Sequence, residues 1–433
     1  MNEVIIGILG VLALVVVFAS GFEIGFGLAV LGFLGFSYLV SMKAAFAMVS
    51  HDVMDIFTSY GFTVLPVFVL MGQVSFNAGI AKRLYNAANT FMGHVPGGLA
   101  MATVGACTAF GSVVGSTSAT AATFSAVAIP EMDRYNYSKT LSAGIVSSAG
   151  VLGCLIPPSV PLIIYGMITE VSIGKLFLAS IIPGLLIALF FLITIFGWVR
   201  MNPSLAPKGE KFSWKERFTS LKQVIFVAII FVVVMGGIIK GFFTPTEAGS
   251  VGCFTVALMA FLKRDLTLKG FALSLTESLV ASAMVIMLIT GSTIFGHFIT
   301  ITKIPLYMGD WVVGLPLNRY IILAMIGLIY LLGGSVIDDL AFMILATPIL
   351  YPVMTKLGFD LIWFGIFLQI VVMIGSIIPP IAVNVFIVNK ISKVPVWTIY
   401  RGVYPFIIGM AIVCFLLALF PRLALFIPSL VKL

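Results

Sequence analysis

The stretch that decides the fold is Phe110-Gly-Ser-Val-Val-Gly-Ser-Thr-Ser-Ala-Thr120, which lies in the middle of a long segment of low charge, 97–130. The segment is apolar enough to enter a bilayer, but its centre is rich in glycine and hydroxylated residues. Lipid cannot hydrogen-bond non-helical backbone, so such a break is tolerated at membrane depth only where it lines protein or a water-filled cavity. We therefore predict a re-entrant helical hairpin over about 97–130, with its tip inside the protein.

The composition places this hairpin in an integral membrane protein. The chain has 433 residues, of which 61% are hydrophobic and 9% are charged, against roughly a quarter charged in ordinary soluble domains. A soluble enzyme, a disordered chain and a disulfide scaffold are excluded, because none of them accommodates so much apolar surface. Continuous apolar runs such as 225–235 also exclude a membrane β-barrel, whose strands alternate. We expect an all-α polytopic membrane protein.

The second half of the chain repeats the landmarks of the first in the same order, which predicts an internal duplication of the kind transporters use. The matching pairs, separated by 218 to 222 residues, are Gly72 and Gly291, Gly115-Ser116 and Gly334-Ser335, Pro130 and Pro348, Ile156-Pro-Pro158 and Ile378-Pro-Pro380, and Pro183 and Pro405. Coincidence among common membrane residues explains any one pair but not the ordered set.

This duplication predicts the domain organisation. The first half is 1–200, with a hairpin at about 97–130 and a broken helix at about 140–170; 201–222 is a cytoplasmic connecting loop; the second half is 223–433, with a hairpin at about 320–353 and a broken helix at about 361–390. If both hairpins are re-entrant, the two halves are inverted, and 16 of the 24 basic residues lie in the cytoplasm, as the positive-inside rule requires. The net charge of +8 is then a topology signal and does not point to nucleic acid.

The first hairpin tip supplies candidate cation ligands. Hydroxyl groups and the carbonyls freed by a glycine-rich turn are hard oxygen ligands suited to Na⁺. Small-residue helix packing is the alternative, but it needs fewer hydroxyls than are present. The candidate residues are Ser112, Gly115, Ser116, Thr117, Ser118 and Thr120.

Two double prolines mark the broken helices. Each pair removes backbone donors and interrupts a helix, which exposes a positive N-terminal end and free carbonyls. A simple kink is the alternative, but it does not explain two double prolines at matching repeat positions. The candidate residues here are Pro157, Pro158 and Ser159 in the first half, and Pro379, Pro380 and Asn384 in the second.

The second hairpin tip carries a pair of carboxylates, Asp338 and Asp339, which follow Gly334 and Ser335. A carboxylate at membrane depth is costly and indicates function, with a cation as its partner. Na⁺ is the partner we expect; a proton, or an externally exposed turn, is the alternative. One of the two aspartates is expected in the site, and we favour Asp338.

Two smaller expectations concern helix ends and interfaces. The stretch Thr244-Pro-Thr-Glu247 predicts a helix start capped by Thr246. Trp214, Trp363 and Trp397 are predicted to anchor the chain at the membrane interface.

Five motifs carry a resemblance to a known family. They are Pro66-Val-Phe-Val-Leu-Met-Gly72, Gly115-Ser-Thr-Ser-Ala-Thr-Ala-Ala122, Ile156-Pro-Pro-Ser159 with Tyr165, Gly241-Phe-Phe-Thr-Pro-Thr-Glu-Ala-Gly249, and Ile378-Pro-Pro-Ile-Ala-Val-Asn384. With them, essentially the whole chain resembles the large membrane subunit of tripartite ATP-independent periplasmic (TRAP) transporters, within the wider ion-transporter superfamily. The fourth motif is the most specific to that family.

The resemblance implies a function that composition alone does not give. Members import carboxylates such as C4-dicarboxylates, sialic acid or similar sugar acids into bacteria through the inner membrane, by an elevator movement coupled to a Na⁺ gradient. A periplasmic binding protein delivers and largely selects the substrate, and a small four-helix membrane subunit supports the large one. The Na⁺ sites then map to Ser112–Thr120 with Pro157–Ser159, and to Gly334–Asp339 with Pro379–Asn384. No other cofactor is implied.

Two other functions remain open from the sequence. One is a stand-alone Na⁺- or H⁺-coupled anion symporter of the same superfamily, which works without a binding protein. The other is an intramembrane aspartyl protease, which needs a second aspartate facing Asp338 or Asp339. Asp310 and Asp360 are the only later candidates, and both lie in polar loops.

Overall fold

The computed structural model describes residues 3–209, 211–314 and 316–431, and every regular element in these ranges is helical. Within them, six helices are long and apolar enough to cross a membrane, or seven if the bent α11 is counted as one span. The long apolar helices confirm an all-α protein with many membrane crossings. The six are contained in Tyr60–Asn77, Ile173–Met201, Pro245–Leu262, Leu268–Ile301, Arg319–Val336 and Val396–Leu419.

The first half contains ten α-helices and two 3-10 helices among the described residues. They are α1 (Glu3–Ala19), α2 (Ile24–Leu39), α3 (Met42–Thr58), η1 (Tyr60–Thr63), α4 (Val64–Asn77), α5 (Ile80–Met92), α6 (Gly98–Val114), α7 (Thr117–Arg134), α8 (Lys139–Gly150), η2 (Val151–Cys154), α9 (Val160–Thr169) and α10 (Ile173–Met201). The pair α6 and α7 forms the first hairpin, and α8, η2 and α9 form the first broken helix.

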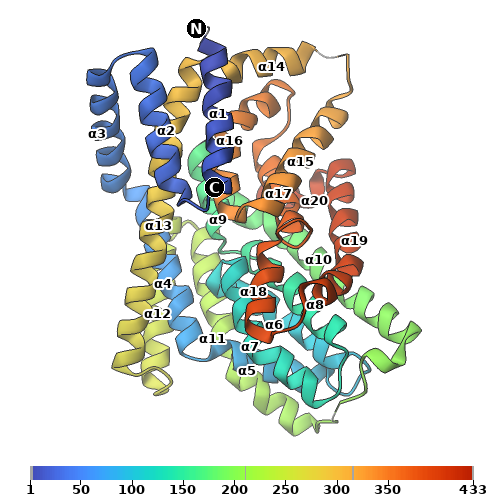
Figure 1. The fold of residues 1–433 in the computed structure, drawn as a ribbon. Helices are drawn as coiled ribbons and strands as arrows, with labels where there is room; N and C mark the ends of the chain where they lie inside the picture. Colours follow the sequence, from blue (N-terminus) through green and yellow to red (C-terminus); the bar gives the residue numbers. More distant parts are fainter. Residues whose placement is uncertain (1–2, 210, 315, 432–433) are drawn as a thin grey trace.

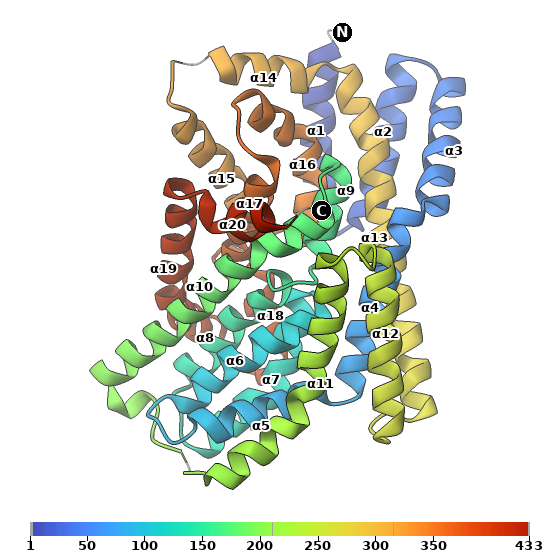
Figure 2. The ribbon, with the colours of Figure 1, turned by 180° about the vertical axis from the view of Figure 1, so that it is seen from behind.

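The second half repeats this order. After η3 (Pro203–Leu205) come α11 (Trp214–Ile239), α12 (Pro245–Leu262), α13 (Leu268–Ile301), α14 (Ile304–Gly314), α15 (Arg319–Val336), α16 (Asp339–Lys356), α17 (Leu361–Gly375), α18 (Val383–Ser392), α19 (Val396–Leu419) and α20 (Arg422–Leu430). The pair α15 and α16 forms the second hairpin, and α17 and α18 form the second broken helix. Helices α5 and α14, which precede the two hairpins, lie at opposite ends of the molecule, as expected of inverted halves (Figures 1 and 2).

The helices form two groups that lie side by side (Figure 1). One group, which we call the scaffold, contains α2, α4, α12 and α13: α13 packs along α2 and α4, and α12 packs along α4. The other group, which we call the hairpin core, contains both hairpins, both broken helices, α10 and α19. The site described below lies where the two groups meet.

Glycines allow the backbones of the scaffold to approach closely, as is common between membrane helices. A Cβ atom on Gly291 of α13 would lie 2.1 Å from the carbonyl oxygen of Gly25 in α2. Further along α2, a Cβ atom on Gly32 would lie 2.6 Å from the backbone nitrogen of Phe295. Helices α2 and α13 therefore pack backbone against backbone, which makes them a rigid pair.

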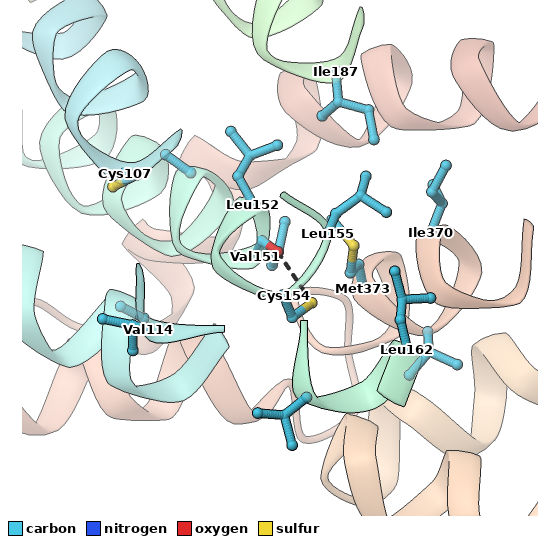
Figure 3. Packing of buried hydrophobic residues seen from close by; sticks show 14 of the residues in the cluster. Cys107, Val114, Val151, Leu152, Cys154, Leu155, Leu162, Ile187, Ile370 and Met373 are labelled. Carbon is cyan, nitrogen blue, oxygen red and sulfur yellow. Dashed lines mark hydrogen bonds between the residues drawn. The ribbon is translucent and has the colours of Figure 1, made fainter. Parts of the chain in front are cut away.

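The apolar centre of the hairpin core lies around the first broken helix (Figure 3). Leu152 and Leu155 are fully buried there between α6, α10 and α17, whose side chains Cys107, Ile187 and Ile370 surround them. The thiol of Cys154 donates to the carbonyl oxygen of Val151 at 3.2 Å. The break is therefore held by packing from both halves of the chain.

Three local expectations are corrected. The connecting segment is shorter than 201–222, because α11 begins at Trp214, with Ser213 and Glu216 forming a capping box; residue 210 lies outside the described ranges. Helix α12 is capped by Thr244 and not by Thr246, since the Thr244 hydroxyl accepts from the backbone nitrogen of Glu247 at 3.3 Å. Trp363 is no interface anchor: it is buried and donates to the carbonyl oxygen of Leu417 at 2.9 Å.

Helices α8 and α19 cross at Gly144 and Gly402 in the hairpin core, and this crossing gives a first prediction. A Cβ atom on Gly402 of α19 would lie 1.9 Å from the carbonyl oxygen of Thr140 in α8. Gly402→Ala should therefore destabilise the protein by roughly 1–3 kcal/mol through overpacking. Thermal unfolding of the purified protein in detergent would measure this. Gly236→Ala is the matched control, since nothing lies within 4 Å of its Cβ position; equal melting temperatures for both variants would contradict the crossing.

Candidate functional site

Each hairpin turns at a tip where one helix ends and the next begins with a capped N-terminus. At the first tip, Gly115 has φ of 66°, which favours glycine, and the Ser116 hydroxyl accepts from the backbone nitrogen of Ala119 at 3.3 Å. At the second tip, the Asp338 carboxylate accepts from the backbone nitrogen of Leu340 at 3.2 Å. Both tips therefore present a helix N-terminus, of α7 and of α16.

The two broken helices differ where the second helix begins after the break. Helix α9 is capped by Ser159, which accepts from the backbone nitrogen of Leu162 at 3.3 Å and donates to the carbonyl oxygen of Cys154. Helix α18 has no side-chain cap; it starts after Ala382, whose φ is 56°. The Tyr400 hydroxyl donates to the preceding carbonyl oxygen of Ile381 at 3.2 Å. The bond between the two prolines is cis in both breaks.

Each hairpin tip is hydrogen-bonded to the break of its own half. The carbonyl oxygen of Gly115 accepts from the backbone nitrogen of Val160 at 3.4 Å. In the second half, the carbonyl oxygen of Ser335 accepts from the backbone nitrogens of Ile381 and Ala382 at 3.1 and 3.0 Å. Space at the first contact is tight, because a Cβ atom on Gly115 would lie 2.7 Å from the carbonyl oxygen of Pro158. Tip and break thus form one unit in each half.

The two tips meet each other through a side-chain pair. The Thr117 hydroxyl donates to the Asp339 carboxylate at 3.1 Å, and both residues are buried. Asp338, which we favoured from the sequence, caps α16 instead. The carboxylate that bridges the halves is therefore Asp339, while both aspartates line the same cavity.

Asn384 is a buried polar side chain without a partner. It is 0% exposed, and neither its amide oxygen nor its amide nitrogen has a hydrogen-bond partner among the described residues. Its backbone nitrogen donates to the carbonyl oxygen of Ser376 at 3.1 Å. A buried amide costs free energy unless something satisfies it, so a ligand that met the Asn384 amide would be stabilising.

A cavity of about 620 Å³ lies between the tips and the scaffold. The hairpin core contributes both tips and the start of α9, and the scaffold contributes α4 and α13. The residues on the hairpin-core side are Phe110, Val114, Gly115, Ser116, Thr117, Ser118, Ala119, Ala122, Thr123, Val160, Pro161, Asp338, Asp339 and Leu340; those on the scaffold side are Val69, Gly72, Gln73, Phe76, Glu277, Ala281, Met284 and Val285.

The structure brings six of the predicted site residues to the cavity and places the other ten behind or beside it. At the cavity lie Gly115, Ser116, Thr117, Ser118, Asp338 and Asp339. Buried behind the tips and the breaks are Ser112, Thr120, Pro157, Pro158, Ser159, Gly334, Ser335 and Asn384. Pro379 and Pro380 are exposed. The hydroxyls of Ser112, Thr120 and Ser335 all donate to carbonyls in their own segments.

The polar residues on the scaffold side were missed by sequence reasoning. Glu277 opens a segment, 277–301, that otherwise reads as an apolar span, and Gln73 lies within the apolar stretch 60–76. An ionisable residue within a membrane helix is by default a candidate functional residue. The sequence alone therefore makes Glu277 a candidate. Its position opposite the hairpin tips is known only from the structure.

The arrangement of helices can be compared with that of known folds. A solved structure, the YdaH transporter of Alcanivorax borkumensis, has a TM-score of 0.60 to this chain at 13% identity and covers 87% of this chain and 89% of its own. At that identity, the likeness shows the fold alone.

The sequence relatives give the family. Residues 11–423 match the family described as tripartite ATP-independent periplasmic transporter, DctM component. The C4-dicarboxylate TRAP transporter large permease protein of Pseudomonas aeruginosa is 33% identical over 371 residues, 86% of each chain. The sialic acid TRAP transporter large permease protein of Vibrio cholerae is 32% identical over 414 residues, 95% of this chain and 96% of its own.

The chain therefore belongs to the large permease subunits of TRAP transporters. It is a transport protein and not an enzyme, so the aspartyl protease considered above is excluded. The two aspartates therefore need no catalytic role.

The contact between the two tips gives a second prediction. Thr117→Val and Asp339→Ala should have non-additive effects on the free energy of unfolding, with a coupling of about 0.5–1.5 kcal/mol. Unfolding of both single variants and the double variant in mixed micelles would measure it. Thr123→Val is the matched control, because the Thr123 hydroxyl bonds to Ala119 in its own helix. A zero coupling for Thr117 would contradict the contact.

Proposed function

We propose that the chain imports an organic carboxylate, such as a C4-dicarboxylate, sialic acid or a similar sugar acid, across the bacterial inner membrane by Na⁺ symport. The observation that carries the proposal is the matched pair of tip-and-break units, with Asp339 bridging them. Two sites that the repeat relates, both rich in carbonyl and hydroxyl oxygens, suit a hard monovalent cation, and the cavity between them suits a small organic ion.

Na⁺ would bind where each tip meets its break. In the first half, the ligands would come from the oxygens around Gly115 to Ser118 and the carbonyls freed at 157–159. In the second half, they would come from the tip at 334–339 and from the amide oxygen of Asn384, which is buried without a partner among the described residues. Buried, unsatisfied oxygens and a carboxylate without a basic partner are what a bound cation would stabilise.

The substrate carboxylate would lie against the hairpin core. The N-terminal ends of α7, α9 and α16 line the cavity, and helix N-termini attract anions. Among the described lining residues there is no lysine, arginine or histidine. Helix ends and bound Na⁺ would therefore offset the negative charge of the substrate, and the anion would bind only after the cation.

The partners we propose are those of the family: a periplasmic binding protein that delivers the substrate and a small four-helix membrane subunit. The hairpin core would move as an elevator against the scaffold. The scaffold side of the cavity comes from the C-terminal half of α4 and the N-terminal half of α13. The basic residues mark the nearer ends of these two helices as cytoplasmic, so this arrangement would be the one facing the cytoplasm.

Na⁺ coupling gives a third prediction. Proteoliposomes with the small subunit and the binding protein should take up radiolabelled succinate or N-acetylneuraminic acid in a Na⁺ gradient and not in a K⁺ gradient. Asp339→Asn and Ser116→Ala should lower this uptake at least about tenfold, because each removes an oxygen ligand or its charge. NaCl should raise the melting temperature of the wild type relative to KCl, and Asn384→Ala should lose that difference.

The matched control is Asp310→Asn, an exposed aspartate paired with Lys356, which should leave uptake unchanged. Undiminished uptake in both the Asp339 and Ser116 variants would overturn the site assignment. Uptake of equal rate without the binding protein would favour a stand-alone symporter.

The elevator gives a fourth prediction. The Cβ position of Gly72 in α4 lies 3.3 Å from the Cα atom of Val114 at the first tip, which is close enough for a disulfide between cysteines there. Oxidised Gly72→Cys/Val114→Cys should be unable to transport and should recover on reduction. Gly25→Cys/Leu288→Cys joins α2 to α13 inside the scaffold and should transport in both states. Full transport by the first cross-linked pair would exclude movement between the scaffold and the hairpin core.

A further inference from the structure

The scaffold side of the cavity carries a carboxylate that the Na⁺ sites do not use. Glu277 lies on α13, opposite Asp338 and Asp339 on the hairpin core, and Gln73 of α4 lies on the same side as Glu277. Most other lining residues on this side are apolar. A single charged group that faces a binding cavity can recognise one end of the substrate.

Glu277 is oriented by its neighbours without being neutralised by them. The Asn77 amide donates to the Ser274 hydroxyl at 2.9 Å and to the Glu277 carboxylate at 3.5 Å. The bond between Asn77 and Ser274 already joins α4 to α13, so Glu277 is not needed for that packing. Among the described residues, no lysine, arginine or histidine pairs with Glu277. Its carboxylate keeps acceptor capacity for a group in the cavity.

The two sides of the cavity differ in what offsets their charge. On the hairpin core, Asp338 and Asp339 lie at the N-terminal end of α16 and receive hydrogen bonds from its backbone. Glu277 lies well inside α13, which begins at Leu268, and is therefore away from the N-terminus of its own helix. With Na⁺ bound at the tips as proposed, a carboxylate of the substrate is favoured there and is repelled beside Glu277. The group that faces Glu277 has to donate a hydrogen bond or carry positive charge.

We propose that Glu277 is a specificity-determining residue that accepts a hydrogen bond from a hydroxyl or ammonium group of the substrate. This rests on the proposed function and narrows it. The substrate class is a hydroxy- or amino-carboxylate, with its carboxylate at the hairpin tips and its donor at Glu277. A plain dicarboxylate, which would bring a second negative charge to Glu277, is disfavoured.

The charge preference of the cavity is measured on the purified protein in detergent. Ala281 lines the cavity one helical turn after Glu277, so Ala281→Cys places a thiol beside it. This thiol is reacted with aminoethyl methanethiosulfonate, a cation, and with sulfonatoethyl methanethiosulfonate, an anion. Each rate is normalised to that of free 2-mercaptoethanol, and the parent protein with its four native cysteines gives the background.

We expect the cation to react preferentially. Adding Glu277→Gln should lower the ratio of cation rate to anion rate roughly fivefold, because it removes a unit charge within one turn of the thiol. Adding Glu170→Gln, at an exposed glutamate outside the cavity, should leave the ratio unchanged. A ratio that favours the anion, or that is the same with and without Glu277, would overturn the inference.

Recognition of the donor is measured with three probes that share a four-carbon skeleton. In NaCl, malate and aspartate should slow the labelling of the Ala281→Cys thiol more than succinate does, and Glu277→Gln should remove the difference. Equal protection by all three, or protection by none, would overturn the proposal for a hydroxyl or ammonium group. Neither labelling experiment requires transport. Failure of Na⁺-driven uptake would therefore reject the proposed function without deciding the role of Glu277, which the labelling rates test independently.

Discussion

The structure depends on the hydrogen bonds between each hairpin tip and the broken helix of its own half. Helices end and begin inside the hairpin core, and each end leaves backbone groups without partners. In a bilayer these groups cannot turn to solvent. The carbonyl oxygen of Gly115 therefore bonds to the restart of the chain at Val160, and the carbonyl oxygen of Ser335 bonds to Ile381 and Ala382. These bonds fix where the tips lie and hence where the cavity forms.

The two tip-and-break units are related by the repeat but are not identical. The first lies deep in the apolar centre of the hairpin core, where Leu152, Leu155 and both of its prolines are buried. In the second, Pro379 and Pro380 are exposed, and the Tyr400 hydroxyl secures the adjoining carbonyl. Inverted repeats place like elements on opposite sides of a membrane, so each unit can be used differently. The break of the first unit is buried throughout, whereas that of the second is exposed at its two prolines.

Much of the fold could be predicted from the local chemistry of the sequence. Glycine and hydroxyl residues around Gly115, and the double prolines, interrupt apolar segments in any context, so the hairpins and breaks follow from sequence. Features set by distant segments did not follow: nothing in the sequence near Trp363 indicates that α19 covers it, and Asn384 gives no sign that both its amide atoms lack partners among the described residues. The choice of Asp339 over Asp338 as the bridge depends on where Thr117 lies, which only the meeting of the two halves determines.

A transporter must both select its substrate and hold it during movement. Glu277 and Asp339 lie on different groups of helices, so each can contribute to a different one of these tasks. In the proposed elevator, groups on the hairpin core, such as Asp339, would remain beside the ions and the substrate throughout a cycle. A group on the scaffold meets the substrate in only one position of an elevator and therefore cannot contribute equally to every step. In that cycle, a carboxylate on the scaffold would contact the substrate only in the arrangement seen here and would then lose contact with it. Selection by Glu277 would thus act on one step, while binding by the tips sustains the whole movement.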